Sequence, residues 1–320
     1  MPTETTEQLL DLVIIGASAA GLSASIYAAR RKLSFVVLSM DIGGEVSRSG
    51  EVENWLGIEH TTGIELSQNF EKHARSYDVD IQNGHSVTRI EQDGSTYIVH
   101  ATYGSEEKVF RTKAIIAATG IHPRSLNIPG EDTLRNKGVT YCTVCDGPLY
   151  KGKTTATIGA GNAAVESALM MAGIASKVYL VTKYTEDVHG GFPKAETILV
   201  DKVKALDNVE IIYNASTTNI LGDARVTGFT YTQDGGEPIE QHVDGVMVHI
   251  GMIPNSSFID CVTKNEQKEI EVGLNGATSC PGIFAAGDVT NVPYKQIIIS
   301  AGQGATAALT AIDYINRWEA

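Results

Sequence analysis

The chain has 320 residues, enough for two domains, and an ordinary balance of 42% hydrophobic and 20% charged residues. Its net charge is −13, from 25 basic and 38 acidic residues, and no Lys/Arg cluster stands out, which argues against a nucleic-acid partner. The segment Met1–Gln8 has two glutamates and no basic residue, unlike a secretory signal, and the longest apolar stretch, 297–312, is too short to span a bilayer. We therefore expect a cytoplasmic protein without a membrane segment.

A first βαβ unit is predicted near the N-terminus. Its segments are the buried strand 11–15, the glycine-rich turn 16–21, the helix 22–31 and the strand 34–38. Gly16 permits the tight turn, Gly21 lets the helix pack close to the strand, and the free N–H groups of the helix then face a pyrophosphate. Ser18 replaces the middle glycine of the GxGxxG pattern, but serine is small enough for close backbone approach. We therefore predict a dinucleotide-binding turn.

A pair of cysteines lies further along the chain, after a predicted buried strand at 115–120 that ends at a cofactor. Cys142 and Cys145 have the CxxC spacing, which allows them to close a disulfide, open to a dithiol and carry two electrons. The alternative is half of a structural zinc site, which needs two more thiolate or imidazole ligands, and the sequence has no second CxxC and no HxxxH. Cys261 and Cys280 stand alone and are predicted to be small apolar fillers.

A second βαβ unit follows the cysteine pair. Its segments are the strand 155–158, the turn 159–164, the helix 165–172 and the strand 177–181. Ala164 takes the last glycine position, which serves only helix–strand packing. Either turn alone has the alternative of a plain βαβ connection without a ligand. Two such turns with a CxxC between them predict two bound dinucleotides, a permanently bound flavin and a nicotinamide that binds and dissociates in each cycle.

Taken together, these residues resemble the low-molecular-weight thioredoxin reductase family over essentially the whole chain. The matching segments are 16–21, 43–44, 51–55, 118–120, 142–146, 159–164 and 284–289. Segments 142–153 and 292–299 are also similar to the flavoprotein subunit of alkyl hydroperoxide reductase, which carries an extra N-terminal thioredoxin-like module. Because this chain begins only ten residues before its first predicted strand, we expect any such module to be a separate protein.

The resemblance implies an α/β fold with two Rossmann-like dinucleotide-binding domains. A discontinuous FAD domain, residues 1–120 and 251–320, is expected to hold an inserted NAD(P)H domain, residues 121–250, which carries the CxxC. Gly251–Pro254 is predicted to be a turn between the domains. Since the nicotinamide and the CxxC must both reach the flavin, the inserted domain is expected to rotate between two positions. A homodimer is also implied.

The resemblance further implies FAD contacts from both parts of the outer domain. They are Gly16, Ser18, Ala19, Ala20, Gly21, Asp41, Gly43, Gly44, Glu45, Asn54, Val87, Ala118, Thr119, Gly120, Gly287, Asp288, Lys295, Gln296 and Ile297. Asp288 is expected to hold the ribityl chain, and Gln296 with Ile297 the isoalloxazine ring. For Asp41 two interpretations stay open, a ligand of the ribose or a solvent-exposed acid in a loop. Glu45, which stands where many relatives have glutamine, either tunes the flavin potential or points to water.

The expected NAD(P)H contacts follow the second turn and its second strand. They are Gly159, Gly161, Asn162, Ala163, Ala164, Thr182, Lys183 and Lys194. NADPH users of the family have His-Arg-Arg where this chain has Thr182-Lys183-Tyr184, and no acidic residue ends the strand to bind a free 2′-hydroxyl. We expect NADPH as the donor with NADH also possible. Ferredoxin or a deazaflavin are the alternative donors.

The roles of the redox residues come from the same resemblance. Cys145 is implied to face the flavin and Cys142 to attack the disulfide of a protein substrate. Asp146 is expected to be the general acid–base, with a helix cap as its alternative. His249, on an apolar strand beside the domain junction, is expected to be structural rather than a proton-transfer group.

The sequence therefore predicts a thioredoxin-disulfide reductase that passes electrons from NAD(P)H through FAD and Cys142/Cys145 to thioredoxin or a thioredoxin/glutaredoxin-like protein. A ferredoxin–nicotinamide reductase of the same fold is disfavoured because those proteins have no CxxC. A flavin redox sensor without turnover is disfavoured because it needs no second nucleotide turn. No metal is expected.

Overall fold

The computed structural model describes residues 4–319, with side chains from residue 8, so the prediction for Met1–Gln8 falls partly outside the described residues. Its contacts divide the chain into two compact units, Met1–His122 with Ile253–Ala320, and Pro123–Met252. The two connections pair as the short strands β9 (Ile121–Pro123) and β18 (Met252–Pro254). The prediction of a turn at Gly251–Pro254 was therefore wrong, because a partner distant in sequence satisfies the backbone of this segment as a strand.

The first unit is built on a seven-stranded sheet in the order β5-β2-β1-β8-β7-β6, with β19 also paired to β8. Its strands are β1 (Glu4–Ala17), β2 (Phe35–Ile42), β5 (Ile81–Asn83), β6 (His85–Asp93), β7 (Thr96–Tyr103), β8 (Glu106–Ala117) and β19 (Ile283–Ala285). The pairs that involve β1, β2, β5 and β19 are parallel, whereas β6, β7 and β8 form an antiparallel meander. β1 begins before the predicted Asp11 because its first residues pair with Lys108 and Val109 of β8.

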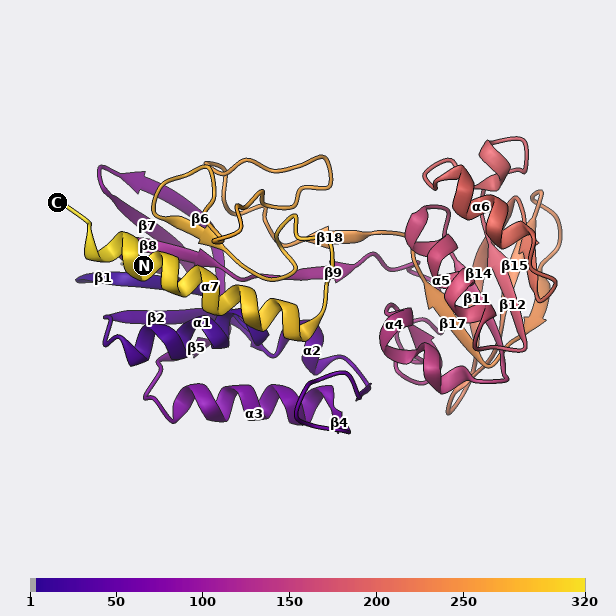
Figure 1. Cartoon of the computed structure of the whole chain (residues 1–320), viewed down its shortest axis with the longest axis horizontal. Helices are drawn as coiled ribbons and strands as arrows, with labels where there is room; N and C mark the ends of the chain where they lie inside the picture. The colour runs from indigo at the N-terminus through magenta and orange to yellow at the C-terminus, as the bar shows by residue number, and fades with distance from the viewer. Residues whose placement is uncertain (1–3, 320) are drawn as a thin grey trace. The chain divides into compact units, whose positions relative to one another are not determined.

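Helices cover the parallel part of this sheet (Figure 1). α1 (Ala19–Arg30) and α7 (Ile297–Asn316) lie against its strands, and α3 (Gly63–Arg75) packs against α1. The single turn α2 (Gly44–Ser47) and the hairpin β3 (Glu51–Val52) and β4 (Thr61–Thr62) are nearby in sequence. α7 runs beside α1. Glycine at position 304 allows the two helices to approach closely, because a Cβ there would lie only 2.0 Å from the carbonyl oxygen of Ala20. This packing places the N-terminal part of α7 against the start of α1.

The second unit has a five-stranded parallel sheet in the order β10-β17-β11-β12-β13 and a three-stranded sheet, β14-β15-β16, whose pairs are antiparallel. The strands are β10 (Val139–Thr140), β11 (Thr154–Ile158), β12 (Lys177–Val181), β13 (Val209–Ile212), β14 (Ala215–Gly222), β15 (Val226–Gln233), β16 (Ile239–His242) and β17 (Gly245–Val248). Its helices include α5 (Asn162–Ala172) and α6 (Thr197–Lys204). The α/β prediction with two Rossmann-like domains is confirmed.

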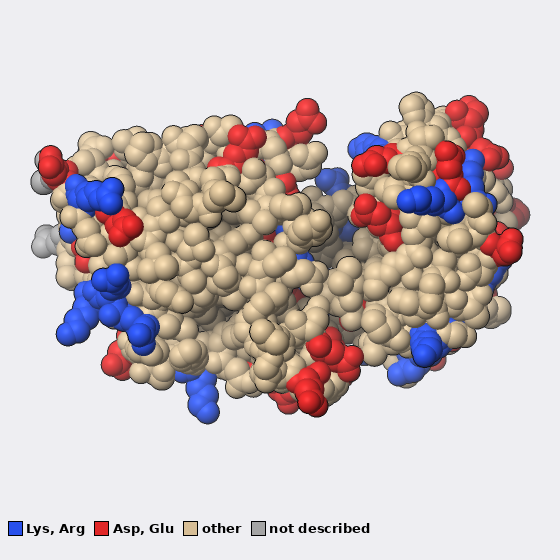
Figure 2. Space-filling view, in the orientation of Figure 1, with Lys and Arg blue, Asp and Glu red and all other residues tan. Residues whose placement is uncertain are grey.

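The surface carries charges of both signs. On the face shown in Figure 2, Lys and Arg side chains lie in small groups with Asp and Glu side chains nearby, so this face presents no continuous basic surface to a polyanion. Within residues 4–319, no helix has both the length and the apolar content needed to cross a membrane.

Candidate active site

The cysteine pair forms a disulfide in the second unit. Cys142 and Cys145 are joined with their Cα atoms 5.3 Å apart; Cys142 precedes the single turn α4 (Thr143–Asp146), and Cys145 lies within it. Cys142 is the N-cap residue of this short helix, and its Sγ accepts a hydrogen bond of 3.3 Å from the backbone N–H of Cys145. An N–H aimed at a sulfur stabilises the thiolate form once the disulfide is open. The geometry therefore favours Cys142 as the nucleophilic thiol.

Asp146 and Thr140 form a polar pair beside the disulfide. The Thr140 hydroxyl donates to the Asp146 carboxylate and accepts a hydrogen bond of 3.1 Å from the backbone N–H of Cys142. Burial raises the pKa of Asp146, against the opposing effect of the hydrogen bond from Thr140. Within the described structure, the Asp146 side chain makes no capping hydrogen bond to the 3₁₀ turn Gly147–Tyr150 that follows it. The capping bond of the alternative interpretation is therefore not present among the described residues, and the acid–base role of Asp146 stays a prediction.

The first nucleotide turn connects β1 to α1. Gly16 has a φ of +111°, and a Cβ there would lie 2.2 Å from the carbonyl oxygen of Ala118. A Cβ at Gly21 would lie 1.8 Å from the carbonyl oxygen of Gly16. Ser18, the N-cap of α1, has a φ of −120° that any residue adopts, and its Oγ donates to the carbonyl of Gly43 at 2.7 Å. The two glycines are thus sterically required, and the departure at Ser18 fits the turn.

The residues expected around the flavin come from separate elements of the first unit. Asp288 follows β19 and accepts a hydrogen bond of 2.8 Å from Ser300 of α7. Burial raises the pKa of Asp288, and nearby Glu45 acts in the same direction, whereas the Ser300 hydrogen bond and Lys295 lower it. Glu45 therefore lies within electrostatic reach of Asp288, although about a third of its side chain (31%) is exposed. Lys295 pairs with Glu269 at 2.9 Å, which holds its ammonium in place.

Other predicted flavin contacts are also fixed by hydrogen bonds. The exposed Asn54 donates to the side-chain oxygen of Gln296 at 3.2 Å, which joins two predicted sites that are 242 positions apart. The hydroxyl of Thr119 donates to the carbonyl of Asn255 at 2.6 Å. Asp41, at the end of β2, is half exposed (51%) and lies 3.6 Å from Arg48, so both interpretations of Asp41 stay open. Val87 lies on β6, opposite Ala101.

Sequence reasoning missed Ser300 and Gln303, one turn apart on α7. Ser300 supports Asp288, and the Gln303 side-chain oxygen accepts a hydrogen bond of 2.7 Å from the backbone N–H of Gly287. The only signal was that Ser300 and Gln303 are polar residues in the mostly apolar first half of the helix, so their partners became visible only in the fold.

The second nucleotide turn connects β11 to α5. Gly159 has a φ of +154°, and a Cβ there would lie 2.2 Å from the carbonyl oxygen of His249. Gly161 is the N-cap of α5 with φ −118°, the role that Ser18 has in the first turn. Lys194 forms a β-bridge with Gly161, which places this lysine beside the turn. The turn therefore has the steric requirements of the first one and a cation next to it.

Thr182 differs from what the sequence suggested for a nucleotide contact. Its side chain is buried, with 1% exposed, and its hydroxyl donates to the carbonyl of Gly191 at 2.6 Å. Thr182 therefore supports the following loop and is not available to a ligand, a correction to the predicted contacts. Lys183 is exposed, with its Nζ 5.4 Å from the centre of the Tyr184 ring. Lys183 and Lys194 are the predicted cations that the structure leaves at the surface.

The two remaining cysteines lie in the first unit. Cys280 is buried, as predicted, and its Sγ lies 3.4 Å from the hydroxyl of Tyr97. Cys261 is exposed, so the prediction of a buried filler was wrong for this residue. Although the residue is exposed, partial burial of its thiol and a hydrogen bond to Cys280 raise the pKa of Cys261 to about 12, so it stays a thiol near neutral pH.

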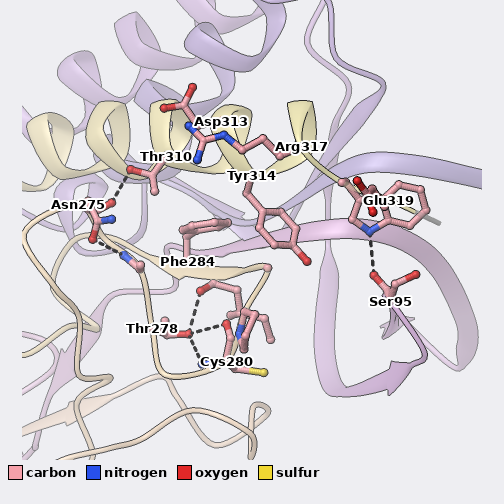
Figure 3. Close-up of a pocket in the computed structure, with 15 residues that line it drawn as sticks. Ser95, Asn275, Thr278, Cys280, Phe284, Thr310, Asp313, Tyr314, Arg317 and Glu319 are labelled. Carbon is pink, nitrogen blue, oxygen red and sulfur yellow. Dashed lines mark hydrogen bonds between the residues drawn. The ribbon is translucent and has the colours of Figure 1, made fainter.

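A separate hollow lies at the C-terminal end of α7 (Figure 3). Tyr314 and Phe284 line it. Trp318 also lines it, and its indole N–H donates to the carbonyl of Ser95 at 3.0 Å. None of the predicted site residues is among the described residues that line this hollow.

The chain matches the family described as pyridine nucleotide-disulphide oxidoreductase over residues 10–308, and it belongs to that family. It is 42% identical over 309 residues to the F subunit of alkyl hydroperoxide reductase from Staphylococcus epidermidis, an alignment that covers 96% of this chain and 59% of that relative. Thus the chain spans about three fifths of the length of that relative.

Solved structures of thioredoxin reductases are similar to this chain over nearly its whole length. Thioredoxin reductase from Giardia duodenalis matches with a TM-score of 0.88 at 29% identity, covering 97% of this chain and 100% of that one. A ferredoxin-flavin thioredoxin reductase from Clostridium acetobutylicum matches with a TM-score of 0.53 at 30% identity, covering 97% and 98%. The chain is thus a pyridine nucleotide-disulfide oxidoreductase, and this family implies FAD and NAD(P)H.

Proposed function

We propose that this protein reduces the disulfide of a thioredoxin-like protein, with electrons that pass from NAD(P)H through FAD and the Cys142–Cys145 disulfide. The observation that carries the proposal is the CxxC disulfide with a buried carboxyl group of raised pKa one residue beyond it. A nucleotide turn in the same unit and a second one in the other unit supply the binding sites for the two dinucleotides. The similarity to thioredoxin reductases supports the acceptor.

The first unit fits FAD, since Gly16 and Gly21 leave no room for side chains in the turn and α1 follows with free N–H groups. When bound, FAD relays the two electrons of a nicotinamide to a disulfide. Asp288 and Gln296 are the residues of this chain that we assign to the ribityl chain and the isoalloxazine ring.

The thiol chemistry is assigned to three residues of the second unit. In the reduced protein, the Cys142 thiolate attacks one sulfur of the substrate disulfide, forms a mixed disulfide and displaces the other substrate sulfur as a thiolate. The Cys145 thiolate then attacks Cys142 Sγ, which restores the Cys142–Cys145 bond and releases the second substrate thiolate. Asp146 accepts the proton of a thiol before attack and returns it to the departing sulfur.

A second acceptor is favoured by the similarity to the F subunit of alkyl hydroperoxide reductase. In this case the disulfide reduced by Cys142 would belong to a protein of an alkyl hydroperoxide reductase system. The two acceptors use the same thiol chemistry, and steady-state turnover with each purified protein separates them.

The choice of nicotinamide gives a testable prediction. Only Lys183 and Lys194 replace the arginines of NADPH-specific relatives, and a lysine is a point charge that makes no bidentate phosphate contact. We expect NADPH to reduce the bound flavin with a preference over NADH of only about ten- to a hundredfold, or roughly 1.4–2.7 kcal/mol. Stopped-flow reduction with each nucleotide measures it, and Lys183→Ala with Lys194→Ala should remove most of the preference.

The matched control is Lys137→Ala, an exposed lysine of the same unit, which should leave the preference unchanged. If neither nucleotide reduces the flavin within seconds at millimolar concentration, the nicotinamide part of the proposal fails. A ferredoxin-type protein would then be the leading candidate for the electron donor.

A further inference from the structure

A short chain of hydrogen bonds runs from the redox turn into the second unit. Thr143, the first residue between the two cysteines, is buried, and its Oγ1 lies 2.7 Å from Nε2 of His249 and 2.6 Å from Oγ of Ser167. Ser167, on α5, lies 3.4 Å from the hydroxyl of Thr157 on β11. The turn that carries the disulfide is therefore hydrogen-bonded to α5 and to the residue that follows β17, and Ser167 links it further to β11.

His249 also supports the second nucleotide turn through its backbone. Its N–H donates to the carbonyl of Ile158 at 2.8 Å, and its carbonyl oxygen occupies the space that a side chain at Gly159 would need. One residue thus contacts the nucleotide turn through its main chain and the redox turn through its ring. Sequence reasoning gave His249 a structural role without a partner.

Burial lowers the pKa of His249 to about 4. The imidazole is consequently neutral near pH 7, and it serves Thr143 as a hydrogen-bond partner rather than as an exchanger of protons. Buried and bonded in this way, it restrains the position of Thr143 with little freedom to move.

We propose that His249, acting through Thr143, is a positioning residue that sets how readily the Cys142–Cys145 disulfide is reduced. The stability of a disulfide relative to its dithiol depends on the effective concentration of one thiol at the other. A turn that is held by hydrogen bonds keeps the effective concentration of one thiol at the other high. Without the contact the turn loosens, so the disulfide becomes easier to reduce. The inference rests on the proposed function, in which this pair cycles between its two states.

The test is the equilibrium of the flavin-loaded full chain with mixtures of reduced and oxidised dithiothreitol. Trapping by alkylation and mass spectrometry of the peptide with both cysteines gives the oxidised fraction directly. We expect Thr143→Val and His249→Leu each to raise the equilibrium constant for reduction about three- to tenfold. A tenfold change corresponds to about 30 mV.

Two further variants separate positioning from general stability. His249→Gln retains a side-chain nitrogen able to bond Thr143 and should stay within twofold of the wild type. Asn208→Ala removes hydrogen bonds of 2.9 and 3.3 Å to carbonyls of the same unit, so it should lower the melting temperature without shifting the equilibrium.

If Thr143→Val, which retains shape and volume, leaves the constant within twofold of the wild type, the inference is overturned, whether or not His249→Leu folds. A wild-type disulfide that dithiothreitol does not reduce at all would instead remove the proposed function, and this inference with it.

Discussion

Cys145→Ser should form a stable mixed disulfide with an oxidised thioredoxin-like protein, once that variant is presented with its Cys142 thiol free. Cys142 then has a substrate disulfide to attack but no neighbouring thiol to release it. Because the N–H of Cys145 points at Cys142 Sγ, the thiolate at position 142 is favoured, and the serine variant retains that backbone donor. Turnover should fall by at least about a thousandfold. Non-reducing electrophoresis and intact mass detect the adduct.

Cys142→Ser is the matched variant, with the same loss of turnover and no adduct. Wild-type protein should show no lasting adduct, since Cys145 resolves it. An adduct that accumulates on Cys142→Ser and not on Cys145→Ser would reverse the assignment of the two sulfurs.

Asp146→Asn should slow thiol–disulfide exchange about a hundred- to a thousandfold, within the range of general acid–base contributions. Asparagine retains the local geometry because its carbonyl oxygen still accepts the hydrogen bond of Thr140, but its amide cannot take up or release a proton near neutral pH. The wild-type rate that depends on the carboxylate as a base should fall as the pH drops through the raised pKa of Asp146. Single-turnover exchange with a dithiol–disulfide pair across pH 5–9 measures this.

The same substitution should not lower the thermal stability of the protein. A carboxyl group whose pKa is raised by burial stabilises the folded state in its protonated form, and this advantage is lost as the pH rises through the folded pKa. Near pH 8 the buried carboxylate is a cost that asparagine does not have, so Asp146→Asn should melt at the same or a higher temperature. Unchanged exchange with a lower melting temperature would make Asp146 a structural residue only.

Much of the fold was accessible from local sequence because the two nucleotide turns have strict steric needs. Gly16 and Gly159 occupy conformations and spaces that exclude side chains, and the continuous apolar strands before them have the length of buried parallel strands. The CxxC spacing likewise predicted the disulfide. These signals are short range, so a single sequence displays them.

The side-chain partners around the candidate site could not be predicted, because they depend on how the chain folds and mostly on contacts between distant segments. Thr182 follows a strand in the expected place, yet a loop nine residues later takes its hydroxyl. Thr140 is two residues from Cys142, but its bond to Asp146 depends on how the chain folds around α4. His249 is 106 positions from Thr143, and no periodicity pairs them. Hydroxyl and imidazole partners of this kind emerge only from the tertiary structure.

The most direct test is a single reduction of the flavin-loaded protein by NADPH, followed by alkylation and mass mapping of every cysteine. The account predicts that oxidation of one equivalent of NADPH per chain opens the Cys142–Cys145 disulfide and exposes two new thiols, at positions 142 and 145 alone. NADPH oxidation that leaves both cysteines in the disulfide would contradict it.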